Sequence, residues 1–392
     1  MKPPTRSSMV LTLAAALGLS FATVAAAQSD LVRNLYVSAA NVPTNVAGVH
    51  TYATPREGFN PLTATDEELA TYGFPPRPDK QADADHYALW ERAMGAAKIR
   101  WHGELKPMPA SGHGMMPTGS LPQEVMAQVP AGPKQMPNIN ASGVVLSNTL
   151  KTWSNTASFN DIWTVISVPV AQLPFASGSC YSSGATDLTE LSFAGIDGRI
   201  IFNAATGYPE FIPGEQGGVF TDVSCGAGLT YYYAYVGWES GYSTVFAVNP
   251  GDLFYTELHA FGGCNPGSVY VEDLTTLTYN SYSVSNPCLV PQVGRTANWM
   301  VGRYCCNGPG IEGAYPLANT IGISFEGAAA LNGSGKIFYP GSQATSTTVL
   351  TMRDNGNTQN IELVNQGSSG FQGQHSLFFQ TTGCAYTGGC AP

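Results

Sequence analysis

The sequence predicts an all-β protein: a two-sheet antiparallel β-sandwich preceded by a partly helical pro-segment. From about Ser142 onward, short runs rich in Val, Ile, Tyr, Phe and Thr are separated by clusters of Gly, Pro, Asn and Ser. No helical periodicity of useful length interrupts these runs. So many short strands in one stretch indicate a sandwich and argue against alternating βαβ units.

Residues 1–27 have the pattern of a secretory signal peptide. Lys2 and Arg6 precede an apolar run from about Met9 to Val24, and small residues then precede Gln28. No other stretch approaches the roughly 20 uninterrupted apolar residues that a membrane span requires. We therefore expect a soluble protein, secreted to the extracellular space or the periplasm, with no membrane partner.

Residues 28–141 differ in composition from the strand-rich part that follows, since they hold most of the Lys and Arg and many prolines. They are predicted to form a pro-segment and linker. A short helix capped by Thr65 or Asp66 should end before Gly73. A longer helix is expected in "DKQADADHYALWERAMGAAKI", where Tyr87, Leu89, Trp90 and Met94 fall at roughly helical spacing. The later loop "KPMPASGHGMMPTGSLPQEV" should be open to proteases. A retained N-terminal domain is the alternative interpretation.

Residues 142–392 form the predicted β-sandwich domain. The expected strands lie in "IWTVISVPV", "TELSFAGID", "RIIFNA", "GGVFTDV", "TYYYAYVGW", "TVFAVNPGD", "LFYTELHAF", "VYVEDLTTLTYNSYSV", "ANWMVGRY", "IGISFEGA" and "TVLTMRD".

The charge balance excludes one class of partner. The chain has 27 Asp and Glu against 17 Lys and Arg, and its net charge is −10. A phosphate backbone requires a basic footprint, so a nucleic-acid partner is not expected. Few cations also mean little positive self-repulsion when carboxylates become protonated, which would favour tolerance of acid. A generic secreted β-protein with a polar surface fits the same composition.

All 8 cysteines lie in the C-terminal part of the chain. An even count in an exported chain favours disulfides, and Cys264 with Cys288 and Cys384 with Cys390 are plausible local pairs. Metal binding is the competing interpretation, but no His stands in ligand-like spacing to these cysteines. We therefore expect no metal and no cofactor.

An ordered series of short motifs runs through the predicted domain: "GIDG" at 195, "QGGV" at 216, "YYYAYVGW" at 231, "NPGD" at 249, "NWMV" at 298 and "YPLAN" at 315. The series resembles the glutamic peptidases, the eqolisin family, secreted acid-acting endopeptidases built as a concanavalin-like β-sandwich. Upstream, "IWTVISVP" is similar to that family's W-T-V-P strand, and "GFNPLTATDEELATYGFPPRPD" to pro-segments of its bacterial members.

The resemblance implies a mechanism that uses one Gln and one Glu. The carboxylate acts as general base on a water, and the Gln amide donates to the developing oxyanion. Gln216 matches the Gln, and Asp197 matches the Asp of the G-I-D motif, which implies a role in substrate binding. Without the motifs, Gln216 would be an ordinary polar strand residue and Asp197 a turn residue.

The family's carboxylates are missing at their expected positions. The E-W-I-V-E strand becomes Asn298 to Gly302, so that the catalytic Glu position is occupied by Gly302. In the aromatic strand, W-Y-E-W becomes Tyr235 to Trp238 with Gly237 in place of Glu, and the Trp two positions before "GID" is Phe193.

Strand alternation suggests a substitute base, because Tyr235, Gly237 and Glu239 should share one face. Glu239 is therefore the hypothetical catalytic base; a strand-end carboxylate exposed to water is the alternative. Tyr235 and Trp299 complete the predicted substrate-binding set, although Trp299 on the opposite face from Gly302 also suits a core residue. The expected function is acid endopeptidase action on proteins by a monomer. The alternative is an inactive homologue that binds a peptide or a glycan.

Overall fold

The computed structural model of the chain describes residues 35–108, 134–138, 141–171, 187–197, 199–202, 209–212, 214–224, 227–238, 241–263, 267–284, 292–302, 318, 320–340, 347–353, 360–366 and 376–381. The predicted signal peptide, every cysteine and Glu239 lie outside these residues. Across the described part of the chain, no helix has both the length and the apolar character to cross a membrane.

The described strands confirm the all-β prediction. One layer of the sandwich contains seven strands, joined edge to edge by antiparallel pairing. In order of pairing these are β14 (Gly241–Ala247), β13 (Leu229–Trp238), β12 (Glu215–Ser224), β9 (Asp187–Ile196), β18 (Thr296–Gly302), β6 (Ala141–Ser147) and β22 (Thr347–Arg353). We call this the first layer.

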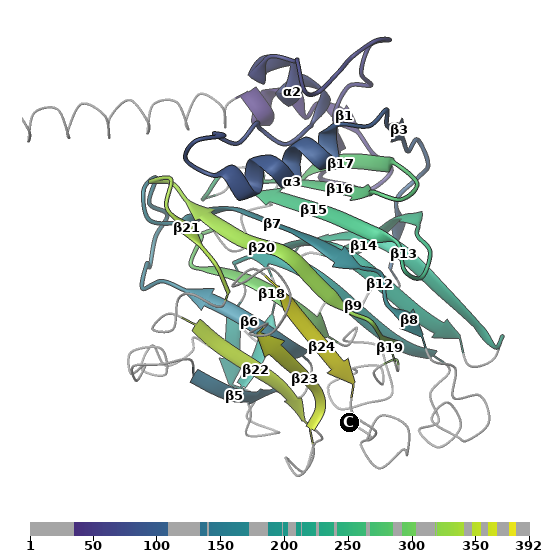
Figure 1. The fold of residues 1–392 in the computed structure, drawn as a ribbon, viewed down its shortest axis with the longest axis vertical. Coiled ribbons are helices and arrows are strands. Elements are labelled where there is room, and N and C mark those ends of the chain that lie inside the picture. Colours follow the sequence, from purple (N-terminus) through teal and green to yellow (C-terminus); the bar gives the residue numbers. More distant parts are fainter. Residues whose placement is uncertain are drawn as a thin grey trace, which may run out of the picture.

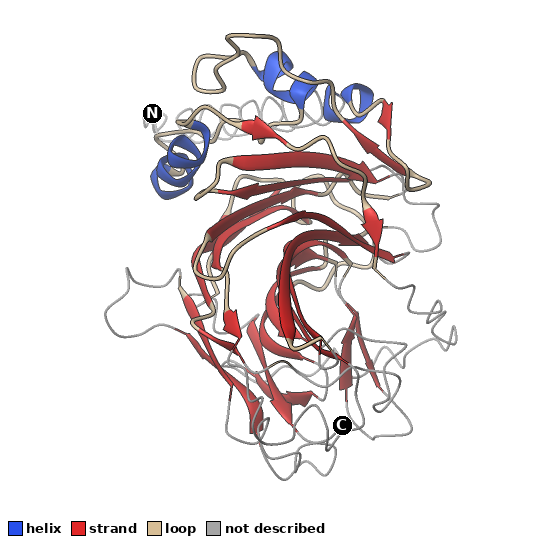
Figure 2. Cartoon of the chain, turned by 90° about the vertical axis from the view of Figure 1, so that its right-hand side faces the viewer, coloured by secondary structure: helices blue, strands red, loops and turns tan. Residues whose placement is uncertain are grey.

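The second layer is packed across the core from the first (Figures 1 and 2). Its strands are β20 (Ser324–Asn332), β7 (Phe159–Ser167), β15 (Leu253–His259), β16 (Gly267–Asp273) and β17 (Thr278–Val284). The predicted run "VYVEDLTTLTYNSYSV" is thus a hairpin of two strands. β23 (Asn360–Gln366) and β24 (Leu377–Thr381) connect β22 to β20, so hydrogen bonding is continuous between the layers.

Shorter elements complete the described sheet. These are β5 (Lys134–Asn138) beside β22 and β21 (Ile337–Phe338) beside β20. Two separate two-stranded sheets are formed by β8 (Val170–Ala171) with β19 (Thr320–Ile321) and by β10 (Arg199–Phe202) with β11 (Pro209–Ile212).

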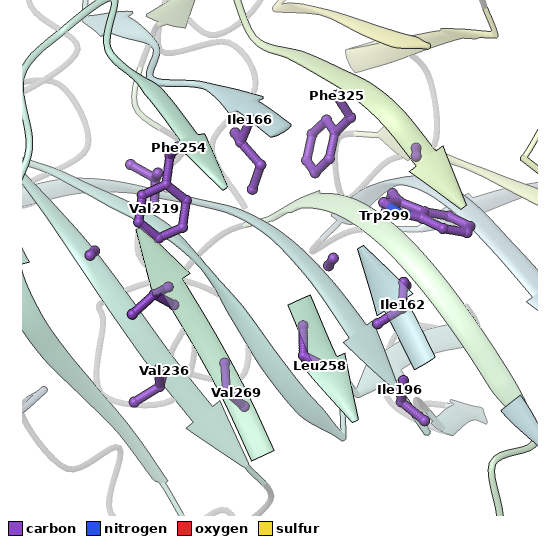
Figure 3. Close-up of a cluster of buried hydrophobic side chains, with 14 of the residues drawn as sticks. Ile162, Ile166, Ile196, Val219, Val236, Phe254, Leu258, Val269, Trp299 and Phe325 are labelled. Atoms are coloured by element: carbon purple, nitrogen blue, oxygen red, sulfur yellow. The ribbon is translucent and has the colours of Figure 1, made fainter. Parts of the chain in front are cut away.

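The main core lies between the two layers and is built by alternation along each strand. Figure 3 shows Ile196, Val219, Val236 and Trp299 of the first layer facing Ile162, Ile166, Phe254, Leu258, Val269 and Phe325 of the second. Every one of these side chains is almost completely buried. The alternate residues of each first-layer strand therefore point away from the core, onto a second face of the same strands.

The N-terminal part carries two helices, α2 (Asp66–Tyr72) and α3 (Ala84–Met94), which lie over the second layer (Figure 1). Thr65 caps α2 in a reciprocal capping box with Glu68, and Gly73 ends the helix in the left-handed conformation at φ 73°. Asp83 caps α3. Both predicted helices are confirmed, and the alternation of cap and stop residues explains their boundaries.

Both helices bury apolar side chains against the outer side of the second layer. Trp90 of α3 and Phe74 pack with Trp163, Tyr255 and Tyr270 of the sheet. We call this surface of the second layer the helix-covered face.

The same N-terminal part also adds short strands to both layers. β2 (Val49–Thr51) and β3 (Ile99–Arg100) pair with β17, β1 (Val42–Pro43) pairs with β2, and β4 (Lys106–Pro107) pairs with β14. Residues 35–108 therefore pack as an integral part of the folded chain.

Candidate functional site

The register of four strands brings the predicted Gln into one row with three other residues. Gln216 of β12 pairs with Gly237 of β13 on one side and with Gly195 of β9 on the other. Gly195 in turn pairs with Asn298 of β18. Residues in register across a sheet point to the same face, and this face is the one turned away from the main core. We call these residues the Gln216 row and their surface the Gln216 face.

Two residues with side-chain amides flank the glycine at the centre of this row. Gln216 and Asn298 are both completely buried. A Cβ atom added to Gly195 would lie 3.0 Å from Oδ1 of Asn298 and 3.4 Å from Cβ of Gln216. The missing side chain of Gly195 thus leaves space for the Asn298 amide, whereas Nε2 of Gln216 lies toward the opposite neighbour, 3.0 Å from a Cβ atom added to Gly237.

The hydrogen-bonding groups of these amides are mostly unpaired. The Tyr235 hydroxyl donates to Oε1 of Gln216 over 3.3 Å, which leaves the Gln216 Nε2 amine as the remaining group. Among the described atoms, Nε2 of Gln216 and both Nδ2 and Oδ1 of Asn298 have no hydrogen-bond partner. A buried polar group without a partner costs about 1–3 kcal/mol, which a ligand that pairs with it would recover.

Tyr235 lies on the same face as Gln216 and Gly237. It is completely buried on the Gln216 face, and burial, with Tyr242 nearby, raises the pKa of its phenol well above the usual value. The phenol therefore stays protonated and acts as a hydrogen-bond donor. Its contact with Gln216 fixes which end of that amide is free.

The packing around position 237 explains why a glycine stands there. A Cβ atom added there would lie 2.4 Å from the Tyr242 ring and 3.0 Å from Nε2 of Gln216. The space beside Gly237 is taken by an aromatic ring and an amide. A carboxylate at position 237 would displace Tyr242.

Gly302 does not lie in the Gln216 row. It pairs with Leu191, four residues along β9 from Gly195, which corresponds to about 13 Å along the strand. The position that the register places across Gly195 from Gln216 is Asn298. A neutral amide therefore stands across Gly195 from Gln216.

Trp299 lies on the opposite face of β18 from the Gln216 row. It is completely buried in the main core between the layers, and its ring Nε1 donates to the backbone oxygen of Trp163 over 3.5 Å. Of the two interpretations of Trp299 open from the sequence, the core residue matches its position. A substrate on the Gln216 face would not contact it.

Asp197 follows β9, and its side chain forms hydrogen bonds with the backbone before β18. Its carboxylate accepts hydrogen bonds from the backbone amides of Val293, Gly294 and Arg295 over 2.5–2.7 Å. Burial raises the pKa of this carboxyl, and these amides act in the opposite direction. With φ at 61°, Asp197 turns the chain out of β9 and fixes the segment before β18, so it positions Asn298 indirectly.

Glu215 neighbours Gln216 in sequence but points to the core side of the sheet, as alternation predicts. Gln292 donates to its carboxyl over 2.8 Å, and the missing side chain of Gly267 makes room for it. Burial raises the pKa of Glu215 to about 8. This carboxyl cannot serve as a base on the Gln216 face, and the predicted substitute, Glu239, lies outside the described residues.

Sequence reasoning did not find Asn298, Gly195 or Tyr242 as members of this site. The signal was present in part, since Asn298 opens the "NWMV" motif and Gly195 opens "GIDG". Their meeting depends on the register of β9 with β12 and β18, which no local pattern encodes. The chemistry of the assembled site is that of neutral amide donors and an amide acceptor.

Next to this row, apolar and aromatic side chains extend the Gln216 face. Phe193, Phe220 and Met300 form one cluster with Tyr235, and Tyr233 and Tyr242 pack against it. Tyr231 and Tyr233 follow on β13, stacked with ring centroids 6.4 Å apart, and Tyr231 is 38% exposed. In the described residues, no group of three or more His, Cys, Asp and Glu is arranged to hold a metal ion.

No family model matches this sequence, and no curated protein matches it. Among solved structures it is similar to scytalido-glutamic peptidase with a peptide-based transition-state analogue, at 16% identity and a TM-score of 0.44, covering 62% of this chain and 98% of that chain. It is similar to SCP-B, a member of the eqolisin family, in complex with the tripeptide Ala-Ile-His, at 17% identity and a TM-score of 0.43 over 62% and 98% of the two chains. It is also similar to aspergilloglutamic peptidase from Aspergillus niger, at 18% identity and a TM-score of 0.37 over 50% and 99%. At this level of similarity the matches assign neither an activity nor a site residue to this chain.

Proposed function

We propose that this chain is a secreted, glutamic-peptidase-like protein that binds extended peptides on the Gln216 face. The observation that carries the proposal is the pair of completely buried amides, Gln216 and Asn298, whose donors have no partner among the described atoms. A peptide laid across the row could accept from the Gln216 amine with one carbonyl and from the Asn298 amine with another, and Oδ1 of Asn298 could accept from a peptide N–H. Neutral amides suit a neutral backbone because no charge has to be desolvated.

The aromatic residues of the same face support an extended ligand. Tyr231 and Tyr233 continue the face along β13 beyond Tyr235. Aromatic rings along one strand offer apolar contact area at low conformational cost. The amides would then fix the backbone of the peptide, and the rings would contact its side chains.

Retention of a defined decapeptide library tests this proposal. The full chain is immobilised at pH 4, and the retained peptides are quantified by mass spectrometry. Replacing one donor by Gln216→Leu or Asn298→Leu should weaken retention roughly 3- to 10-fold, as expected for one hydrogen bond. The matched control is Gln81→Leu, because Gln81 is an exposed amide in the N-terminal part. Equal retention by all four proteins, or by none, would refute the proposal.

A second candidate function is acid endopeptidase action with Glu239 as base. The observation that favours it is that Tyr235 and Gly237 of β13, four and two residues before Glu239 in the sequence, lie on the Gln216 face. The Glu239 carboxylate would take a proton from water while the water oxygen adds to the peptide carbonyl carbon. The Gln216 amide would donate to the oxyanion, and the carbon–nitrogen bond would break as the amine takes that proton.

Hydrolysis of denatured casein between pH 2 and 5 distinguishes the candidates. New amino termini that disappear in Glu239→Gln would support the endopeptidase. Retention of peptides without any new amino terminus supports binding alone. Cleavage that persists unchanged in Glu239→Gln would exclude Glu239 as the base.

Export and maturation belong to the same proposal: residues 1–27 direct secretion, and residues 28–141 are a pro-segment. Removal of that segment would bare Trp163, Tyr255 and Tyr270 on the helix-covered face. We therefore expect a cleaved segment to stay bound to the sandwich. Sequencing the amino termini of the secreted protein, with gel filtration under native conditions, tests both points.

A further inference from the structure

The outer edge of the first layer carries a short segment of the chain itself. β4 pairs antiparallel with β14, with Lys106 opposite Thr244 and Pro107 opposite Ser243. The backbone N–H of Met108 donates to the backbone oxygen of Tyr242 over 3.0 Å. Within the described residues, β4 is the strand on the side of β14 that faces away from β13. Hydrogen bonds between backbones do not depend on the identity of the side chains, so another extended peptide could replace β4.

The side chain of Met108 reaches the Gln216 face. It is 4% exposed and belongs to the same apolar cluster as Phe193, Tyr235 and Met300. Burial of this side chain stabilises the segment through the hydrophobic effect, whereas Lys106 and Pro107 are exposed. The segment is therefore held by its backbone and by one unbranched apolar side chain.

The Met108 contact leads directly to the Gln216 row. Tyr242, whose backbone oxygen holds the Met108 amide, also supplies the ring that packs over Gly237 beside Nε2 of Gln216. A peptide in the place of β4 would thus enter the Gln216 face at the end of the row that carries Gly237.

We propose that the outer side of β14 is a docking strand for extended peptides with a bulky unbranched apolar side chain, and that Lys106–Met108 occupies this strand in the intact chain. The inference rests on the proposed peptide binding by the Gln216 face and names the specificity of that binding. Occupation by the chain's own segment also explains why Ser243 and Thr244 are only 2% and 7% exposed on an edge strand.

Hydrogen–deuterium exchange of the full chain tests the docking strand. Met108→Asp should release the segment and speed exchange of Tyr242–Thr244 at least tenfold, because a carboxylate would have to enter the apolar cluster. The chain should remain folded, since Leu105 stays in the main core with its backbone clamped by Asn45. Met108→Gln is the milder second variant, and Lys106→Asp, at an exposed position, is the matched control with expected wild-type protection.

Adding a peptide to the released chain tests the specificity. Acetyl-Lys-Pro-Met-Pro-Ala amide at millimolar concentration should restore protection of Tyr242–Thr244 in Met108→Asp. The same peptide with Asp in place of Met, or with an N-methylated Met, should not. Unchanged exchange in both Met108 variants, or restoration that ignores the Met side chain, would overturn the inference. If the peptide restores protection equally well in Met108→Asp with and without Gln216→Leu, the docking strand is supported and the amide site is refuted. The two proposals can therefore be refuted independently of one another.

Discussion

The two outer faces of the sandwich bury polar groups in opposite ways. On the helix-covered face, Glu257 of β15 lies between His86 of α3 and His259, with ring nitrogens 3.5 and 3.2 Å from its Oε1 atom. His259 also contacts Asp161, and the Tyr255 hydroxyl donates to Glu257. On the Gln216 face, the buried groups are neutral amides with donors that have no partner among the described atoms.

The difference suggests that the helix-covered face stabilises the fold and that the Gln216 face is suited to bind a ligand. Burial by itself would raise the pKa of Glu257, but the two imidazoles lower it to about 2. Burial would lower the pKa of His259, but Asp161 and Glu257 raise it to about 10. These opposite shifts describe a set of charges that compensate one another. On the Gln216 face, by contrast, the Gln216 and Asn298 amide donors have no partner among the described atoms and are available to a ligand.

The largest expected effect comes from breaking the charge set. Glu257→Gln leaves the cations of His86 and His259 buried without their shared carboxylate, and should cost about 3–5 kcal/mol of unfolding free energy. Urea denaturation at pH 6 measures this change. A loss below about 1 kcal/mol would show that the helix-covered face does not depend on the ion pairs.

A pH effect of nearly the same size should come from buried carboxyls outside that set. Burial raises the pKa of both Glu190 and Glu215 to about 8, from 4.5 in the unfolded chain. Between these values only the folded state keeps the proton, so each group lowers stability as pH rises from 4.5 to 8. The loss is about 5 kcal/mol per group at most.

Denaturation curves at pH 5 and pH 8 check this linkage. The wild type should be less stable at pH 8, and Glu190→Gln should reduce the difference. Stability that rises between pH 5 and pH 8 would contradict it. The result bears on acid tolerance, which the small number of cations also favours.

A smaller effect is expected where the Gln216 face is closely packed. Gly237→Ala should cost about 1–3 kcal/mol, because its methyl group would meet the Tyr242 ring. In a chain that already carries Tyr242→Ala, adding Gly237→Ala should cost much less unfolding free energy than it costs in the wild type. Additive costs in that cycle would show that Tyr242 does not fill the space at position 237.

The smallest effect is expected at the amide site. Gln216→Leu removes a buried donor that has no described partner, which offsets the loss of the hydrogen bond from the Tyr235 hydroxyl to Oε1, so the unfolding free energy should change by about 1 kcal/mol or less. The contrast with Glu257→Gln sharpens the comparison of the two faces. A large loss on Gln216→Leu would mean that this amide stabilises the fold.

Local patterns predicted those parts of the fold that local physics controls. The capping signal at Thr65 set the start of α2, and alternation placed Trp299 and Gly302 on opposite faces of β18. The strand at Ala141–Ser147 escaped prediction, because its "ASGVVLS" run begins with small residues and lacks alternation. β23 and β24 were also missed.

The site was predictable as a set of motifs but not as a geometry. Gln216 and Tyr235 meet on one face because neighbouring strands β12 and β13 are joined by a short turn. The placement of Gln216 and Asn298 on either side of Gly195 depends on β9 pairing with both β12 and β18, across a long separation in sequence. A shift of register would change which residue stands across Gly195, and the sequence alone does not fix that register.

Side-chain amide NMR of Gln216 and Asn298 tests the central claim most directly. Their ¹⁵N-attached protons can be assigned by the loss of signals in Gln216→Leu and Asn298→Leu. The peptide that the wild type retains most strongly is then added to saturation. If both amides donate to carbonyls of the bound peptide, the protons of both side chains move downfield together. If backbone signals show the peptide bound while neither side-chain amide moves, the Gln216 face does not recognise peptides in this way.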